Sequence, residues 1–504
     1  MENFGCRTNQ SDGDSIAAAM ERLGAEPVSS QDADIVVVNT CSVTAEAERD
    51  ARAYIRRAQR QRPGARIVVT GCYAQRASQE IAALDGVHAV VQNSQKHRTA
   101  EVSLRDSSHL RTPANPGLVP LSSLTATSAR RSPEMPGASP LVIGSEAFAH
   151  TDILLPSFPA SVMQRMHTGV GNRTRPSLKI QDGCGNRCTF CIIPETRGNS
   201  RSLPREQVLD AVHQFIAAGG QELVLTGINL GRWGRDLAPQ SRFEDLLAEI
   251  FGTTALARLR ISSVEPMDWT DGMNALLRRW GTGTHPRLAR HVHLPLQSGS
   301  DAILRRMHRR YRPWHYAERL AAVRSASPHA AIGADVMVGF PGETDAEFQE
   351  NLDFISAQPF TYLHLFPFSA RPGTPGWQLH QRQPVPGEAV KARMAVLRRV
   401  IEQKNLEFRA SCLNRPLSVL TLMSSRENPQ RTPALSDNFI PVEVEGAWPP
   451  NTLVSAQIAA ISAHGLQASL PPEPLAQTSA TQPAQQQSSL RGAEPEMLYS
   501  RSEA

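Results

Sequence analysis

Six of the seven cysteines form two groups of three, and thiolates are the ligands that soft metal centres prefer. In the compact group, Cys184, Cys188 and Cys191 have the spacing C-x3-C-x2-C. A structural zinc site takes four ligands, and no His or Cys follows Cys191 closely. Three thiolates on a four-iron cluster leave one iron open for a cofactor or substrate, and Phe190 would shield that cluster from water. The spacing therefore favours an iron–sulfur cluster over a zinc loop or free buried thiols.

The second group, Cys6, Cys41 and Cys72, has no local motif. Cys41 and Cys72 each follow a short β-branched run, residues 35–39 and 67–70, that predicts a buried strand. A single cysteine is more often an inert buried residue than a ligand. Three cysteines that converge at the carboxyl edge of one sheet instead predict a second three-thiolate cluster. An odd number of cysteines in a chain without a secretion signal argues against a disulfide framework.

Residues 1–96 have the pattern of a sheet that would bring this second group together. Apolar residues at helical spacing predict a helix over Ser15–Leu23. Thr44, followed by Glu48 in the first turn, predicts a capped second helix, and Val87–Val91 predicts a third strand. Strands that alternate with helices imply a parallel sheet, so this unit is an α/β domain.

The rest of the chain divides into four segments by composition and periodicity. The first is rich in Pro and Ser and predicts a linker or a poorly ordered insertion. About six strand–helix repeats then predict a partial or complete (β/α) barrel, short β-like runs predict a small β-barrel, and a Pro- and Gln-rich tail predicts disorder. Cys412 precedes the small barrel, and we expect it to be a buried hydrophobe. In chain order, the segments are 97–171, 172–410, 411–470 and 471–504.

Composition limits the classes of function. The 504 residues are 40% hydrophobic and 20% charged, without an apolar run long enough to span a membrane, so we expect a cytoplasmic protein. A net charge of +5 permits a nucleic-acid partner but does not require one. Aromatic residues at 5% argue against broad surfaces for base stacking.

The compact group, with Phe190 before its third cysteine, resembles the cluster motif of the radical S-adenosylmethionine (SAM) superfamily. The segments around the dispersed cysteines resemble the N-terminal domain of the methylthiotransferases, which holds an auxiliary 4Fe–4S cluster in that family. The C-terminal β region resembles a TRAM domain, an RNA-binding barrel, through a weaker signal. Further segments similar to the methylthiotransferases are 178–184, 191–194, 197–202, 225–231, 293–300 and 335–344.

The resemblance implies SAM as a cofactor and two 4Fe–4S clusters. One SAM would donate a methyl group toward sulfur at the auxiliary cluster, and a second would supply the radical that abstracts hydrogen from carbon 2 of a modified adenine. Both clusters must then face one enclosed chamber, because contact with solvent would quench a primary radical. The implied ligands are Cys184, Cys188 and Cys191 for the radical SAM cluster and Cys6, Cys41 and Cys72 for the auxiliary cluster.

Three substrates compete within the family: a threonylcarbamoyl-modified adenosine in tRNA, an isopentenyl-modified adenosine in tRNA, and an aspartate of a small-subunit ribosomal protein. Segments 39–44, 226–233 and 262–266 are most similar to the threonylcarbamoyl branch. The expected partners are the tRNA anticodon stem-loop, an electron donor and a sulfur source, without DNA or a membrane. A non-catalytic RNA-binding protein with a cluster is the alternative from another class, and it leaves the compact cysteine loop unexplained.

Four residues at predicted strand ends are candidates to bind SAM or the adenosine. Gly227 would let SAM approach the backbone closely. The other three would hydrogen-bond the cofactor or the nucleoside, or would stabilise loops instead. They are Glu265, Gln297 and Asp335.

For other polar residues, the sequence allows more than one role. Arg197 and Arg201 would meet tRNA phosphates or the SAM carboxylate, or remain solvated. The basic helix predicted over 385–409 would hold tRNA or form a solvated face. For His291 and His293, which flank a predicted strand, we expect structural roles.

The N-terminus departs from the family pattern. Only Met1 to Asn3 precede Phe4, where family members have a full strand before the first cysteine. Either the true start lies upstream of Met1 or the sheet has lost an edge strand. The Pro-rich insertion is also longer than the family leads us to expect.

Overall fold

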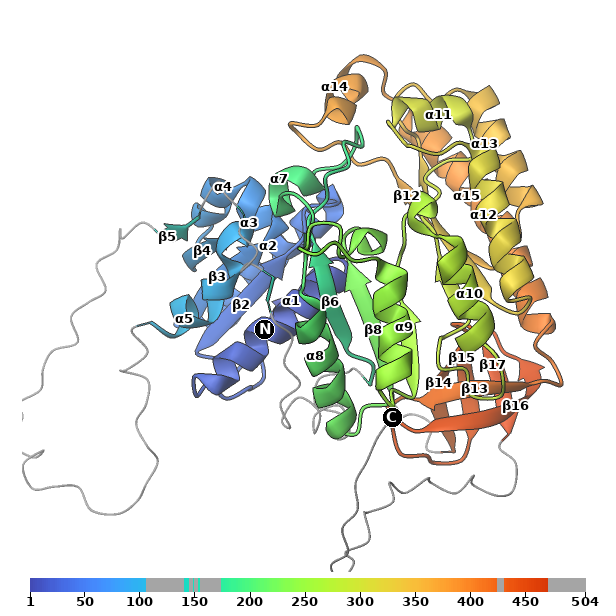
Figure 1. Cartoon of the computed structure of the whole chain (residues 1–504). Coiled ribbons are helices and arrows are strands. Elements are labelled where there is room, and N and C mark those ends of the chain that lie inside the picture. Colours follow the sequence, from blue (N-terminus) through green and yellow to red (C-terminus); the bar gives the residue numbers. More distant parts are fainter. Residues whose placement is uncertain (106–139, 145–147, 149–152, 155–173, 424–429, 470–504) are drawn as a thin grey trace, which may run out of the picture.

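The computed structural model describes residues 1–105, 140–144, 148, 153–154, 174–423 and 430–469. They form an N-terminal α/β domain, an open (β/α) barrel beside it, and a closed β-barrel beneath the (β/α) barrel (Figure 1). This arrangement confirms the predicted fold class. The predicted tail, 471–504, lies outside the described residues.

The N-terminal domain is a parallel sheet between two layers of helices. Val36 and Val38 pack toward one layer with Ile55, whereas Val37 packs toward the other with Ile16, so both faces are buried. The strands, in sheet order, are β1 (Glu2–Asn3), β2 (Ile35–Thr40), β3 (Arg66–Gly71), β4 (Val87–Gln92) and β5 (Leu141–Ile143). The helices are α1 (Arg7–Arg22), α2 (Ala45–Gln61), α3 (Cys72–Arg76), α4 (Ser78–Ala82), the 3-10 helix η1 (Asn93–Arg98) and α5 (Thr99–Leu104).

At the start of the chain, the predicted beginning of the first helix is wrong, and the structure excludes one of the two alternatives for the edge strand. Helix α1 begins at Arg7, two turns before the predicted Ser15, because its first turns bury polar side chains against the (β/α) barrel and so show no apolar period. The edge strand is not lost: β1 is short, and its Asn3 pairs in parallel with Asn39.

The predicted insertion, 97–171, is also partly regular. Helix α5 and strand β5 both lie within it and complete the N-terminal domain, with β5 pairing in parallel with β4. Burial of Val102 in the layer beside Ile16 explains why α5 packs there. Most of the remaining insertion lies outside the described residues.

The (β/α) barrel has the six predicted parallel strands. Two sheets form it, and a bridge between Ser263 and His293 joins them. Helix α1 packs along β6 and β8 from outside. The parallel strands are β6 (Ser177–Asp182), β8 (Glu222–Gly227), β9 (Arg258–Ile261), β10 (His291–His293), β11 (Ala331–Val338) and β12 (Tyr362–Pro367), and the short β7 (Arg201–Ser202) runs antiparallel to β6.

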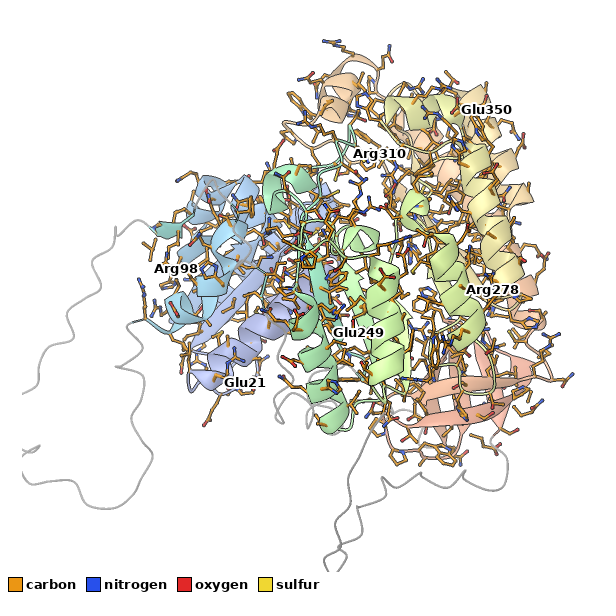
Figure 2. The ribbon with its side chains drawn as sticks, viewed as in Figure 1. Glu21, Arg98, Glu249, Arg278, Arg310 and Glu350 are labelled. Atoms are coloured by element: carbon orange, nitrogen blue, oxygen red, sulfur yellow. The ribbon has the colours of Figure 1, made fainter. Side chains whose placement is uncertain are left out.

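Helices follow the strands and cover the outside of the barrel. Arg278 on α10 is exposed, whereas Glu249 on α9 pairs with Arg205 of the neighbouring α8 (Figure 2). No helix in the described part of the chain is both long and apolar enough to cross a membrane. The longer helices are α8 (Arg205–Ala217), α9 (Phe243–Thr253), α10 (Asp271–Trp280), α12 (Pro313–Ala326), α13 (Asp345–Ala357) and α15 (Gly387–Ala410); the shorter ones are α7 (Ile193–Arg197), α11 (Asp301–Arg306), α14 (Pro375–Arg382) and the 3-10 helices η5 (Leu230–Arg232) and η6 (Pro266–Asp268).

The C-terminal β-barrel packs on the amino ends of the (β/α) barrel strands. Arg258, the first residue of β9, donates to the Ser418 hydroxyl at 3.1 Å, and Arg290 pairs with Asp437. Cys412 is buried beside this barrel, as predicted. The strands, in barrel order, are β13 (Pro416–Thr421), β14 (Arg431–Ser436), β15 (Pro441–Glu445), β17 (Leu466–Ser469) and β16 (Leu453–Ile461). The sequence did not predict β14 and β17, in which polar residues interrupt the apolar pattern.

Candidate functional site

The loops that carry the dispersed cysteines meet at the carboxyl edge of the N-terminal sheet. Cys6 precedes α1, Cys41 follows β2, and Cys72 begins α3 directly after β3. Gly5 has a φ of 96°, and a Cβ at this position would lie 2.5 Å from the Sγ of Cys41. Burial raises the pKa of Cys41 to about 12, and the nearby thiols of Cys6 and Cys72 add to this shift. Three cysteines that are far apart in the sequence therefore lie together.

The compact group lies between β6 and α7, at the carboxyl end of the first strand of the (β/α) barrel. The side-chain amide of Asn229 donates to the Sγ of Cys184 at 3.6 Å, and Arg309 donates to the Sγ of Cys188 at 3.3 Å. Burial raises the pKa of Cys191 to about 12. Cys41 and Cys72 are buried, Cys6 is exposed, and the three compact cysteines are partly buried; each group also has N–H donors close to sulfur.

The donor chemistry of both groups suits iron–sulfur clusters. Each group consists of three cysteines, and each thiolate of a four-iron cluster binds a different iron. All the cysteines are free of disulfides, and N–H donors to sulfur are the contacts that iron–sulfur clusters accept. The donor sets therefore fit such clusters.

Five charged side chains, which we call the ion cluster, are buried between the N-terminal domain and the (β/α) barrel. Arg197 Nη1 lies 2.8 Å from Asp182, and Arg197 Nη2 lies 3.2 Å from Asp12. Lys96 pairs with Asp12 at 2.6 Å, and Lys179 contacts both carboxylates. The members are Asp12 of α1, Lys96 of η1, Lys179 and Asp182 of β6, and Arg197 of α7.

The ion cluster reaches one of the dispersed thiols. The Nε of Arg197 donates to the Sγ of Cys72 at 3.2 Å. Asp182 lies two residues before Cys184, and Arg197 ends the helix that follows Cys191. The ion cluster therefore links the compact cysteine loop to the dispersed group.

A second buried contact joins the two domains beside Cys41. Glu48 of α2 pairs with Arg76 at 2.9 Å and with Arg371, from the loop after β12, at 3.2 Å. Ser42 donates to the same carboxylate. This contact fixes the loop after β2 against the (β/α) barrel.

A cavity of about 390 Å³, which we call the chamber, opens between the loop after β2 and the compact cysteine loop. Val43 lines it from the loop after β2, and Phe190 and Cys191 line it from the compact cysteine loop. Gln297 and Asp335 line it from the carboxyl end of the (β/α) barrel. The volume lies within the range of small-molecule sites. Residues next to both cysteine groups therefore share one cavity.

Two of the four candidates at strand ends line the chamber. Gln297 has a φ of 68°, and its Oε1 is buried without a hydrogen-bond partner in the described structure. Because an unpaired buried acceptor is costly, this atom is placed to receive a donor from a bound molecule. The Asp335 side chain is 28% exposed and lies 3.6 Å from His293.

The other two candidates flank the compact cysteine loop. Glu265 accepts from Arg309 at 2.6 Å, so the arginine that contacts Cys188 also holds this carboxylate. Gly227 ends β8, and a Cβ there would lie 3.0 Å from the side-chain oxygen of Gln181. Neither residue lines the chamber itself.

Several basic residues lie in buried environments that the sequence did not predict. Arg197 and Arg201, expected to meet tRNA or SAM or to be solvated, are both buried, and Arg201 donates to the carbonyl of Arg197. On the basic helix α15, Arg393 is also buried and pairs with Glu343 at 2.8 Å, so part of its basic face packs inward. These arginines have acidic or carbonyl partners that are not visible from local sequence.

The histidines at the two ends of β10 pack against an aromatic side chain. His291 and His293 are buried and stack on Tyr362, and the Nε2 of His291 lies 2.6 Å from the Tyr362 hydroxyl. Sequence reasoning missed Arg309 as a site residue, because it lies in an arginine-rich run without a motif. Its contact with Cys188 depends on a fold that brings residues 121 positions apart together.

Comparison with known proteins gives two matching families. "Uncharacterized protein family UPF0004" matches residues 1–92, and "Radical SAM superfamily" matches residues 178–355. The chain is also similar, at 17% identity and a TM-score of 0.51, to the solved radical S-adenosylmethionine methyltransferase TsrM from Kitasatospora setae, over 75% of this chain and 76% of that one. This likeness concerns the fold.

Curated relatives cover most of the chain. "Threonylcarbamoyladenosine tRNA methylthiotransferase MtaB" of Bacillus subtilis (strain 168) is 34% identical over 88% of this chain and 89% of its own. The protein of the same name from Aquifex aeolicus is 32% identical over 88% and 96%. "tRNA-2-methylthio-N(6)-dimethylallyladenosine synthase" of Acidothermus cellulolyticus is 32% identical over 83% and 76%.

The carboxyl of Asp335 provides a pH test of the chamber. Burial raises its pKa from 3.8 to about 6, and Arg309 opposes this only in part. The folded state then binds a proton more tightly than the unfolded state, so stability falls as pH rises from about 4 to about 6. Asp335→Asn should therefore raise the free energy of unfolding at pH 7 by roughly 1–3 kcal/mol, after allowance for partial exposure. Thermal melts of metal-free protein measure this.

The same melts at pH 4.5 should show a much smaller difference, because Asp335 is then mostly protonated in the folded wild type. Asp210→Asn, at an exposed carboxylate on α8, is the matched control and should change stability by less than about 0.5 kcal/mol at either pH. A stabilisation by Asp335→Asn that is equal at both values of pH would contradict the assignment.

Proposed function

The chain belongs to the radical SAM methylthiotransferase family, and we propose that it adds a methylthio group to carbon 2 of N6-threonylcarbamoyladenosine next to the anticodon of tRNA. Relatives that are named for this nucleoside and that cover most of the chain support the proposal. The relative named for dimethylallyladenosine makes that nucleoside the competing substrate.

One observation carries the proposal: residues beside two separate cysteine groups line the same chamber. Val43 lies two residues after Cys41, and Cys191 is itself part of the wall. A methylthiolation that uses two clusters needs both to face one bound nucleoside, since a reactive centre must lie next to the atom it attacks.

Membership of the radical SAM superfamily implies SAM and a 4Fe–4S cluster, and we assign the compact group, Cys184, Cys188 and Cys191, as its ligands. We assign the dispersed group, Cys6, Cys41 and Cys72, to an auxiliary 4Fe–4S cluster. When both are bound with SAM, they supply an electron for radical formation and sulfur for transfer.

The residues of the chain would bind, orient and enclose SAM and the adenosine. The Oε1 of Gln297 would accept a hydrogen bond from SAM or the adenosine, and Asp335 would face the same molecule. Phe190, which lines the chamber with other apolar side chains, would keep water from the reacting atoms. Glu265, held by Arg309, and the backbone at Gly227 would contact SAM at the edge of the compact cysteine loop.

The proposed partners follow from the reaction. The tRNA would reach the chamber with its anticodon stem-loop, and the C-terminal β-barrel, at the opposite end of the (β/α) barrel strands, would bind the same RNA as a TRAM-like module. An external reductant and a sulfur source would complete each cycle. We expect the protein to act in the cytoplasm, where tRNA is modified.

Nucleoside mass spectrometry of tRNA from cells with and without the gene tests the substrate directly. We expect the 2-methylthio form of threonylcarbamoyladenosine to disappear in the deletion strain and to return with the wild-type gene, but not with Cys41→Ala or Cys191→Ala. Loss of the methylthio form of dimethylallyladenosine, which is the isopentenyl-modified adenosine, would instead assign the competing substrate. Unchanged tRNA would reject a tRNA substrate.

Substitution of Gly5 should separate the two halves of the reaction. Gly5→Ala places a methyl group against the Sγ of Cys41 at a φ that disfavours a side chain, so it should displace that thiol without touching the compact cysteine loop. The purified variant should still form 5′-deoxyadenosine from SAM and dithionite, yet lose at least about 90% of methylthio transfer to tRNA, which is more than ~1.4 kcal/mol in rate.

The matched control is Gly64→Ala, because a Cβ at Gly64 meets no atom within 4 Å. This variant should keep both activities. Failure of the wild-type protein to form 5′-deoxyadenosine at all would favour the non-catalytic RNA-binding protein. Full transfer activity in Gly5→Ala would contradict a role for Cys41.

A further inference from the structure

The ion cluster between the domains contains more positive than negative charge. Among the residues that the structure describes, Lys96, Lys179 and Arg197 pair with two carboxylates, those of Asp12 and Asp182. All five side chains are at most 2% exposed, so water does not balance the surplus. A buried charge without a partner is strongly unfavourable, so a surplus cation indicates an anion nearby.

The geometry of Arg197 indicates where that anion lies. Its two terminal nitrogens are engaged: Nη1 by both carboxylates of the ion cluster, and Nη2 by Asp12 and the neutral amide oxygen of Asn9. Its remaining donor, Nε, lies 3.2 Å from the Sγ of Cys72. Because the guanidinium is planar and rigid, the two carboxylates fix the direction in which Nε–H points. The surplus charge is therefore directed at one of the dispersed thiols.

A cation and an N–H donor held at a ligand sulfur act on an iron–sulfur cluster through electrostatics. Reduction adds one negative charge to the cluster, and a nearby positive charge stabilises the reduced form more than the oxidised form. Hydrogen bonds to sulfur and burial are among the factors that set cluster potentials over a wide range. Removal of such a contact should shift the potential to more negative values.

We propose that Arg197 is a positioning residue that holds the Cys72 thiolate and raises the reduction potential of the auxiliary cluster. This inference rests on the proposed function, because it requires that the dispersed group carries a cluster. It assigns Arg197 to the protein interior, in contrast to the contacts with tRNA or SAM expected from the sequence. The ion cluster would then have an electrostatic role in addition to joining the domains.

The test uses the full chain with Cys184, Cys188 and Cys191 all replaced by Ala, so that the auxiliary cluster is the only one bound. Its potential is measured by titration with dithionite, followed by electron paramagnetic resonance. In this background, Arg197→Gln should shift the potential to more negative values and alter the spectrum of the reduced cluster. An unchanged potential and spectrum in Arg197→Gln would overturn the proposal.

Lys96→Gln is the matched control, because it removes one positive charge from the same buried ion cluster without touching sulfur. Its shift should be clearly smaller than that of Arg197→Gln; equal shifts would overturn the role of the contact with Cys72. Arg197→Lys keeps the charge but loses the planar fork, and should shift the potential in the same direction by less.

Should Arg197→Gln fail to fold, Arg197→Lys replaces it, and a potential identical to the parent would then overturn the proposal. Iron binding by the background protein, in which Arg197 is unchanged, tests the proposed function separately. If the background protein binds no iron, the auxiliary cluster of the proposed function is wrong. If it binds iron and Arg197 has no effect, only the present inference is wrong.

Discussion

The buried ion cluster between α1, η1, β6 and α7 is the contact on which the site depends. Its members come from both domains, and each carboxylate is shared by more than one cation. Removal of one partner from such a buried group typically costs about 3–5 kcal/mol, because the remaining charge is left unpaired. The directional contacts of Arg197 also fix orientation, since the guanidinium donates to both carboxylates. The compact cysteine loop and the dispersed cysteine group are therefore held in one relative position.

The fold places the chamber and the C-terminal β-barrel at opposite ends of the (β/α) barrel strands. The carboxyl ends of the (β/α) barrel strands carry the compact cysteine loop and the chamber, as is usual for barrel enzymes. The amino ends are covered by the C-terminal β-barrel through Arg258 and Arg290. The N-terminal domain packs beside the barrel and brings its own carboxyl edge to the chamber (Figure 1). Two parallel sheets thus present their functional edges to a shared space.

Sequence reasoning succeeded where apolar periodicity or a local motif exists. The strands around Val37 and Val68 are continuous β-branched runs, and the compact cysteines lie within one loop, so both could be identified directly. It failed where polar groups pack between domains. The first turns of α1 and the environment of Arg197 depend on partners up to 188 residues away, and no local pattern encodes them. The predicted strand ends suggested the grouping of Cys41 and Cys72 with Cys6, the resemblance to a family supported it, and the sheet shows how the three meet.

Iron content measures the central claim, two sulfur-ligated clusters in one chain, most directly. Wild-type protein reconstituted without oxygen should bind about eight irons per chain, and replacement of either cysteine group by Ala should leave about four, since each 4Fe–4S cluster holds four. About four irons in the wild type, with no loss when Cys6, Cys41 and Cys72 are replaced, would contradict the account.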